Sequence, residues 1–182
     1  MRFAEVMTAL GDKLGPFFIQ LPDHHGTQGL SLIQDFLGVW PQGAPLHWEL
    51  RNPDWFLADG GPAGEGFDAL EAAGHGTVIT DVAGRRDVLH MQLTTPVLML
   101  RFVGNGLHPT DYQRSDDWIA RIADWWQRGL QAAYIFIHQP DMTQVPAFTG
   151  YWARGLNAAI GSKLIDPPPV PPPMMGVQGS LF

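Results

Sequence analysis

Short apolar runs alternate with segments of helical spacing along most of the chain. Five runs predict buried strands, because each is mainly apolar and is bounded by Gly, Pro or polar residues. Near-continuous apolar runs are typical of parallel strands that are covered on both faces. The predicted strands are Phe17–Leu21, Leu46–Leu50, Thr77–Asp81, Val97–Val103 and Ala132–His138.

The segments between these strands carry apolar residues three and four positions apart, the spacing of one helical face. Ser115 is predicted as an N-cap, with Asp116 and Asp117 in the first turn, where the helix dipole favours acidic side chains. Pro146 is well placed to open the last helix, which Gly161 closes. Helices are therefore predicted over residues 2–14, 30–40, 67–73, 115–128 and 146–160.

The connection between the third and fourth strands departs from this alternation. Residues 83–95 contain GRRDVLH and show no clean period, so we expect an ordered loop with room for one helical turn. The alternation as a whole predicts βα units that place five parallel strands in one sheet. No GxGxxG or Walker motif follows any strand, so neither a dinucleotide nor a nucleoside triphosphate site is indicated, and the cofactor stays unknown.

The composition is that of a globular domain. The 182 residues suffice for one domain with a sizeable core, and 45% of them are hydrophobic. The net charge of −7 argues against a protein that binds polyanions with its whole surface. It is compatible with a local basic cluster that does so. The absence of cysteine excludes disulfides and cysteine nucleophiles. No signal peptide or membrane-spanning run is evident, which makes a cytoplasmic location the default expectation.

The most informative charges lie in the stretch Leu46–Phe56. Glu49 and Arg51 stand two residues apart at the end of a predicted strand, so their side chains should project together. A buried charge pair is costly unless it is satisfied or used. The pair is either a structural ion pair that ties the strand to its loop or part of a functional site.

Five stretches match the pattern of a known family: GPFFIQLP (15–22), WELRNPDW (48–55), ITDVAGRRDVLHMQLTTP (79–96), LRFVGN (100–105) and YIFIHQP (134–140). They follow the order of the YecE-like family, also called domain of unknown function 72, which the chain therefore resembles. The resemblance implies an α/β fold of the (β/α)8 TIM-barrel type and leaves the activity open. Family members begin with about three further βα units, so we expect a partial barrel over residues 1–165. Its two open strand edges would favour self-association, and whether the chain alone is an enzyme stays undecided.

In such a barrel the carboxyl ends of the strands converge on one rim, where barrel enzymes keep their chemistry. Four of the nine arginines fall there and would form a local anion site suited to phosphate, unless they pair with neighbouring carboxylates. No HxH or HExxH spacing supports a metal, and we predict none. The catalytic candidates are Glu49, Arg51, Asp81 and His138, and the substrate-binding candidates are Gln20, Arg86, His90, Arg101 and Asn105.

The character of the chain changes at Asp166. The sequence DPPPVPPPMMG is rich in proline and should be extended, so we treat residues 166–182 as a tether. It ends in QGSLF, which resembles the short peptide by which bacterial replication and repair proteins dock on the DNA sliding clamp, with Gly179 in place of the usual leucine. The alternative is an inert flexible tail. The matching residues are Gln178, Ser180, Leu181 and Phe182.

Three functions are consistent with these features. The first is a barrel protein tethered to the sliding clamp that acts on a phosphate-bearing, nucleic-acid substrate in replication or repair. The tether would raise the local concentration at DNA without a basic surface. The second is a small-molecule enzyme acting on a phosphorylated or sugar substrate, whose tail is incidental. The third is a non-catalytic binding module.

Overall fold

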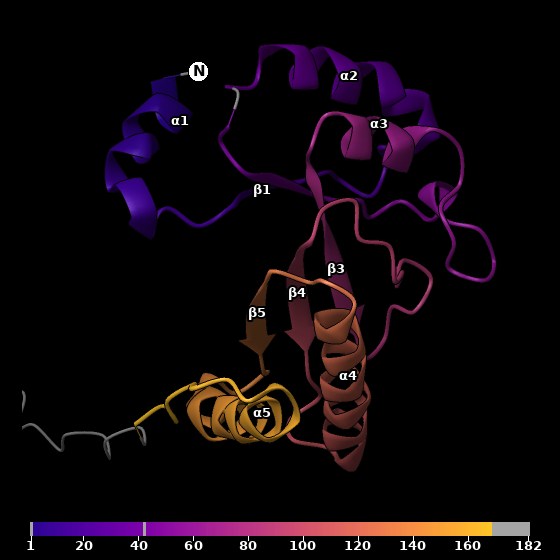
Figure 1. Cartoon of the computed structure of the whole chain (residues 1–182). Helices are drawn as coiled ribbons and strands as arrows, with labels where there is room; N and C mark the ends of the chain where they lie inside the picture. The colour runs from indigo at the N-terminus through magenta and orange to yellow at the C-terminus, as the bar shows by residue number, and fades with distance from the viewer. Residues whose placement is uncertain (1, 42, 169–182) are drawn as a thin grey trace, which may run out of the picture.

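A parallel five-stranded sheet forms the centre of the molecule (Figure 1). The structure is a computed structural model and describes residues 2–41 and 43–168. The order of the strands in the sheet is their order in the chain, and all four pairings are parallel. Each predicted strand is confirmed to within one residue at either end. The strands are β1 (Phe17–Gln20), β2 (Leu46–Glu49), β3 (Gly76–Val82), β4 (Val97–Val103) and β5 (Ala132–His138).

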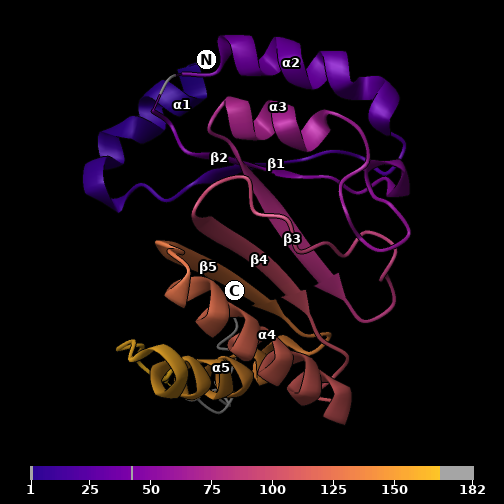
Figure 2. The ribbon, with the colours of Figure 1, turned by 45° about the vertical axis from the view of Figure 1, so that its right-hand side comes forward.

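Helices cover the outer face of the sheet, with α2 and α3 on one flank and α4 and α5 on the other (Figure 2). The last helix begins with Pro146 in its first turn and ends at Gly161, whose φ of 68° is left-handed, as predicted. The helices are α1 (Arg2–Met7), α2 (Leu30–Val39), α3 (Gly66–Ala72), α4 (Pro109–Gln127) and α5 (Val145–Ile160), with short 3-10 segments η1 (Thr8–Lys13), η2 (Thr27–Gly29), η3 (Pro53–Trp55) and η4 (Met142–Gln144).

Two apolar clusters lie between the sheet and these helices. In the first, outward side chains of β3 and β4 pack against α4 and α5, with Trp118 and Trp152 among the buried residues. In the second, Trp48 of β2 packs with residues of α2 and α3. On α4, Trp118, Ile122 and Trp125 are buried, whereas Trp126 is exposed.

The start of α4 was predicted wrongly. The helix begins at Pro109, and the N-cap is His108, whose Nδ1 accepts from the backbone N–H of Thr110. Ser115 lies inside the helix and donates its hydroxyl to the carbonyl of Asp111. A proline at the first helical position has the required φ and no N–H to leave unpaired, which explains the earlier start.

The N-terminal segment is not one helix over residues 2–14. After α1 the chain continues in η1, and Gly11 interrupts the helical path with a φ of 57°. Phe3, Val6 and Leu10 are exposed, whereas Ala4 is buried. The apolar face predicted here therefore lies largely uncovered. The ordered loop predicted over residues 83–95, in contrast, is confirmed and contains no helix.

The sheet is strongly curved. Arg101 of β4 donates through Nη1 to Oε1 of Gln20 on β1 at 3.3 Å, although two strands separate them. Gly15, just before β1, lies beside β5, since a Cβ added there would be 3.5 Å from the ring of Tyr134. Among the described residues β1 pairs only with β2 and β5 only with β4, so the sheet forms an open trough rather than a closed barrel. We call the inner side of this trough the concave face.

Candidate functional site

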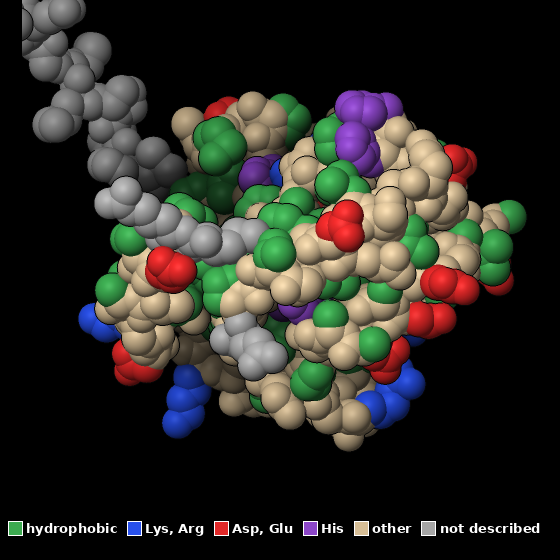
Figure 3. All heavy atoms as spheres, turned by 90° about the horizontal axis from the view of Figure 1, so that it is seen from above, with side chains coloured by type: hydrophobic (Ala, Val, Ile, Leu, Met, Phe, Trp, Pro, Cys, Tyr) green, Lys and Arg blue, Asp and Glu red, His purple; other side chains and the backbone are tan. Residues whose placement is uncertain are grey.

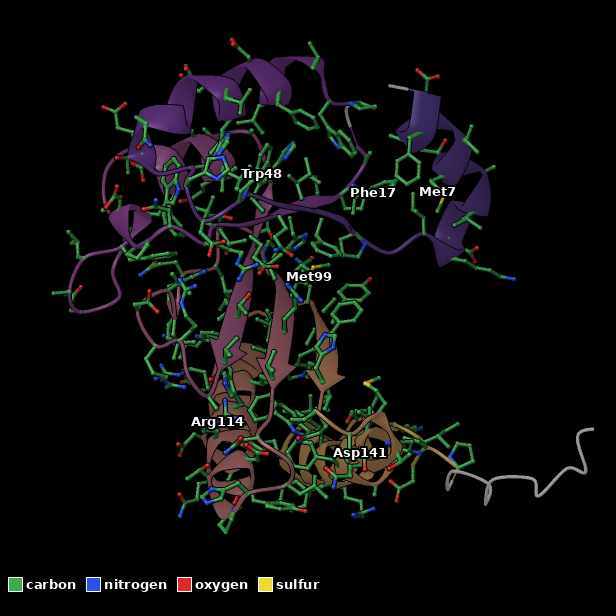
Figure 4. The ribbon with its side chains drawn as sticks, turned by 180° about the vertical axis from the view of Figure 1, so that it is seen from behind. Met7, Phe17, Trp48, Met99, Arg114 and Asp141 are labelled. Carbon is green, nitrogen blue, oxygen red and sulfur yellow. The ribbon has the colours of Figure 1, made fainter. Side chains whose placement is uncertain are left out.

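The alternation of side chains along each strand decides which candidates share a face. On β5, Ile135 and Ile137 pack outward against the helices, so the intervening Phe136 and the following His138 face the concave side. On β4, Leu100 and Phe102 point outward and Arg101 points inward, two residues after Met99 (labelled in Figure 4). The concave face therefore carries Arg101 together with residues from the ends of β1, β2 and β5.

Glu49 is the buried anion of this face. It ends β2, and its exposed fraction is 1%. Its Oε2 accepts from Arg101 Nη1 at 2.5 Å, and its Oε1 lies 4.0 Å from Nε of Arg51. The side chain of Gln20 contacts the same nitrogen of Arg101. Four of the predicted site residues are thus brought together, and the arginine inside the apolar strand β4 has the partners that its burial requires.

The guanidinium of Arg101 has unused donors. Both of its hydrogen bonds use Nη1, so Nε and Nη2 have no hydrogen-bond partner in the part of the chain that the structure describes. Arg51 makes two long ion pairs within the described ranges, at 3.7 Å to Asp23 and 4.0 Å to Glu49. Two guanidinium groups therefore share one buried carboxylate, while Asp23 is mostly exposed. The two guanidinium groups are thus matched by two carboxylates, and among the described residues Nε and Nη2 of Arg101 remain as free hydrogen-bond donors.

The arginines of the loop after β3 satisfy neighbouring carboxylates instead. Arg85 donates to both oxygens of Asp87 at 3.0 and 3.1 Å and also lies 3.5 Å from Asp23. The hydrogen bond from Arg85 lowers the pKa of Asp87 below its usual value. Arg86 is bound to Asp81 at 2.6 Å. The predicted alternative of mutual pairing therefore holds for Arg85 and Arg86.

Asp81 lies on the other face of the sheet from Glu49. Its Oδ1 accepts from Arg86 and from Arg114 of α4, the latter at 2.7 Å, and its Oδ2 accepts from Trp118 Nε1 at 2.7 Å. Arg114 (labelled in Figure 4) also binds Asp111. Asp81 thus ties β3 to α4 and does not join Glu49 in a common site. Arg114 was not among the residues predicted from the sequence, although its position four residues before Trp118 on one helical face was a usable signal.

A cavity of about 520 Å³ opens beside Asp81, between the 83–96 connection and α4. Its charged walls comprise three arginines and three aspartates, so positive and negative groups balance. This cavity therefore has no local positive excess. The charged lining residues are Asp81, Arg86, Arg114, Asp117, Arg121 and Asp124.

Asn105 belongs to a hydrogen-bond network that joins the ends of β4 and β5 to α4. Its backbone N–H donates to Asp111 Oδ2 at 2.7 Å, and the N–H of Gly106 donates to Oε1 of the buried Gln139 at 3.0 Å. A Cβ at Gly104 would lie 2.2 Å from Gln139 Nε2, so any larger residue there would force the Gln139 side chain to move. The contacts of Asn105 are thus those of its main chain, and its predicted role in substrate binding stays a prediction.

His90 serves packing in this structure. It is buried between Phe56, on which it stacks at 5.2 Å, and Phe67. Nδ1 accepts from the N–H of Gln92 and Nε2 donates to the carbonyl of Val78, so both nitrogens are occupied. Burial lowers its pKa to about 4. His90 therefore does not reach the concave face, whereas His138 is half-buried there at the end of β5.

The described residues contain neither a group suited to a metal ion nor a helix suited to a membrane. No group of three or more His, Asp or Glu side chains in residues 2–41 and 43–168 is arranged to hold a metal ion. Within the same ranges, no helix combines the length and the apolar character needed to cross a membrane. The face of the molecule that carries α1, α2 and α3 shows few Lys or Arg side chains, which lie near its edges (Figure 3).

Similar folds occur in two solved bacterial structures. A DUF72 family protein from Enterococcus faecalis V583 matches with a TM-score of 0.67 and 16% sequence identity, over 88% of this chain and 67% of that one. A DUF72 family protein from Thermotoga maritima MSB8 matches with a TM-score of 0.53 and 17% identity, over 75% of this chain and 56% of that one. At these identities the likeness concerns the fold alone.

The sequence comparison points to the same group of proteins. The UPF0759 protein YecE of Escherichia coli K12 is 24% identical over 161 residues, which are 79% of this chain and 58% of YecE. The chain thus spans less than two thirds of the length of this relative. The model of the family described as protein of unknown function DUF72 matches residues 1–173. On this match, which takes in nearly the whole sequence, the chain belongs to the DUF72 family.

Proposed function

We propose that this chain binds a phosphate-bearing ligand at the carboxyl ends of its strands, on the concave face around Arg101. The observation that carries the proposal is the free side of this guanidinium. Glu49 and Gln20 hold Nη1, while Nε and Nη2, which form the fork suited to two phosphate oxygens, have no partner among the described residues. Arg51 adds a second cation beside Glu49.

A neighbouring aromatic ring favours a nucleotide over a simple sugar phosphate. Phe136 is paired with Arg101 in the register of β4 and β5, and it faces the concave side with an exposed fraction of 45%. Exposed aromatic rings beside cationic groups are typical platforms for bases. A base stacked on Phe136 would keep its phosphate near Arg101. The same arrangement would suit a nucleic acid, the substrate in replication or repair that the tail suggests. A free nucleotide is the small-molecule alternative.

The test compares phosphorylated and unphosphorylated probes by isothermal titration of the whole chain. We expect AMP to bind at least about tenfold more tightly than adenosine, as one charge-assisted contact implies. A single-stranded oligonucleotide that binds more tightly than AMP would favour a nucleic-acid ligand. Equal binding of AMP and adenosine would contradict the proposal.

Arg101→Lys is the informative variant because it keeps a cation opposite Glu49 but removes the guanidinium fork. We expect AMP affinity to fall about tenfold, with little change in adenosine binding. Arg128→Lys is the matched control, since Arg128 is exposed on the surface after α4 and, among the described residues, pairs only with Asp124. Unchanged AMP affinity in Arg101→Lys would place the phosphate elsewhere.

We also propose that the C-terminal peptide binds the bacterial sliding clamp. The support is the sequence alone, because Gln178, Ser180, Leu181 and Phe182 lie outside the described residues. Leu181 and Phe182 would fill an apolar pocket, and Gln178 would fix orientation by hydrogen bonds. We expect a labelled 166–182 peptide to bind a clamp saturably in fluorescence anisotropy. The Leu181→Ala, Phe182→Ala peptide should not bind, and no binding by the parent peptide would reject the tether.

A further inference from the structure

Asp23 places its carboxylate between two arginines at the rim of the concave face. Its Oδ1 lies 3.7 Å from Nε of Arg51, and its Oδ2 lies 3.5 Å from Nη1 of Arg85. A charge-assisted hydrogen bond is about 2.7–2.9 Å long, so the carboxylate is near both guanidinium groups but is bound tightly to neither. We call the space between Arg51 and Arg85 in which this carboxylate lies the Asp23 position.

The side chain of Asp23 can leave this position while its main chain stays in place. The carbonyl of Asp23 accepts from Nδ2 of Asn52 at 2.7 Å. Two residues earlier, the N–H of Leu21 donates to the carbonyl of Glu49 at 3.0 Å. The side chain itself is 60% exposed, so a rotation about its own bonds turns it into the solvent. Exposed ion pairs contribute little to stability, so this rotation has a small cost.

The departure of the Asp23 side chain would change the charge balance of the rim. Three arginines and three carboxylates are paired with one another here, so their charges cancel. When Asp23 turns outwards, one positive charge is left uncompensated beside Arg51 and Arg85. An anion of the ligand would restore the balance. The six groups are Arg51, Arg85, Arg101, Asp23, Glu49 and Asp87.

The Asp23 position lies next to the phosphate site proposed around Arg101. Oε2 of Glu49 accepts from Arg101 and its Oε1 lies 4.0 Å from Arg51, so the two guanidinium groups flank a single carboxylate. Phe136 lies beside Arg101 on the strand at its other side, β5. The sheet therefore presents an aromatic ring, a first anion site and a second anion site in succession. A base followed by two adjacent phosphoryl groups matches this order.

We propose that the ligand carries two adjacent phosphoryl groups, as a nucleoside diphosphate does, and that the second displaces Asp23 from between Arg51 and Arg85. This second site rests on the proposed function, because Arg101 binds the first phosphoryl group. The second group accepts the hydrogen bonds that Asp23 is too distant to accept. A ligand with one phosphoryl group does not reach the Asp23 position, so Asp23 acts as an internal competitor of the second group alone.

The experiment measures the binding of ADP, AMP and adenosine to the whole chain by isothermal titration. We expect ADP to bind at least about tenfold more tightly than AMP, as further charge-assisted hydrogen bonds imply. Arg85→Gln should remove most of this advantage. Asp23→Asn removes the competing charge but keeps the size of the side chain, so the affinity for ADP should rise about threefold and that for AMP much less.

Asp54→Asn is the matched control for the Asp23 variant. Asp54 is also exposed, lies in η3 after β2 and forms no ion pair among the described residues. The substitution changes the net charge by the same amount without opening the Asp23 position, so the affinity for ADP should stay close to that of the parent protein.

Two results would overturn the second site while leaving the proposed function in place. One is ADP that binds no more tightly than AMP. The other is an affinity for ADP that rises no more in Asp23→Asn than in Asp54→Asn, since Asp23 would then compete with nothing. Equal binding of AMP and adenosine would instead remove the phosphate site at Arg101, and the second site with it.

Discussion

Arg101 combines a structural and a recognition role through different nitrogens of one group. Nη1 neutralises Glu49, whose carboxylate is almost inaccessible to water. Removing the cation would leave a buried, unpaired charge, at a typical cost of about 3–5 kcal/mol. Loss of ligand binding in an alanine variant would therefore be confounded by loss of stability. The lysine variant separates the two roles because only the fork is lost.

His90 makes the stability of the fold dependent on pH. The folded state keeps the ring neutral with a pKa of about 4, whereas the unfolded chain binds a proton below about 6.5. The contribution of neutral His90 to the free energy of unfolding is complete above pH 6.5 and is lost as the pH falls towards 4. It amounts to about 3 kcal/mol. Burial also lowers the pKa values of His47 and His75, which act in the same direction.

We expect His90→Phe to flatten this dependence. Phenylalanine keeps an aromatic ring between Phe56 and Phe67 but has no proton to bind. The measurement is the free energy of unfolding in urea at several pH values from 7 to 4. A slope identical to that of the parent protein would show that His90 is not the group responsible.

The sequence shows Arg101 inside an apolar strand but does not identify its partner Glu49, which lies 52 positions away along the chain. It paired Glu49 with Arg51, and their atoms approach only to 4.0 Å. It also grouped Asp81 with Glu49, because both end apolar strands. Alternation puts the two carboxylates on opposite faces, and an apolar run that is buried on both sides gives no sign of which face is which.

At the scale of elements, strands were easier to predict than helix ends. Each strand is a compact apolar run, whereas helix ends depend on single residues such as Pro109 and Gly11. The long connection from β3 to β4 was also predictable, since its sequence lacks a helical period. It covers the outer face of the sheet with Val88 and the partly buried Leu89 and Leu93 in place of a crossover helix.

A substitution at Gly104 tests the hydrogen-bond network that joins β4, β5 and α4. We expect Gly104→Ala to lower the free energy of unfolding by about 1–3 kcal/mol, because the added Cβ would displace Gln139 from its hydrogen bonds. Gly38→Ala in α2 is the control. No atom lies within 4 Å of a Cβ there, so the change should be neutral or stabilising. Equal stability of the Gly104→Ala variant and the parent protein in urea unfolding would contradict this account.

For the whole molecule, the open trough predicts that the chain by itself has a low free energy of unfolding or self-associates. Two free strand edges and an uncovered interior expose apolar rings and backbone groups to solvent. We therefore expect residues 1–165 to be marginally stable or to self-associate. Calorimetry and light scattering on the purified chain are the measurements. A monomer with one cooperative thermal transition would contradict the expectation.

The order of the strands has a consequence for synthesis. Each strand from β2 to β5 pairs with the strand that was translated just before it. A chain emerging from the ribosome therefore finds its next hydrogen-bonding partner already outside the exit tunnel, and the sheet can grow one strand at a time from its N-terminal end. The exposed edge of the sheet advances with translation, and β5 is the last of the described strands to be added.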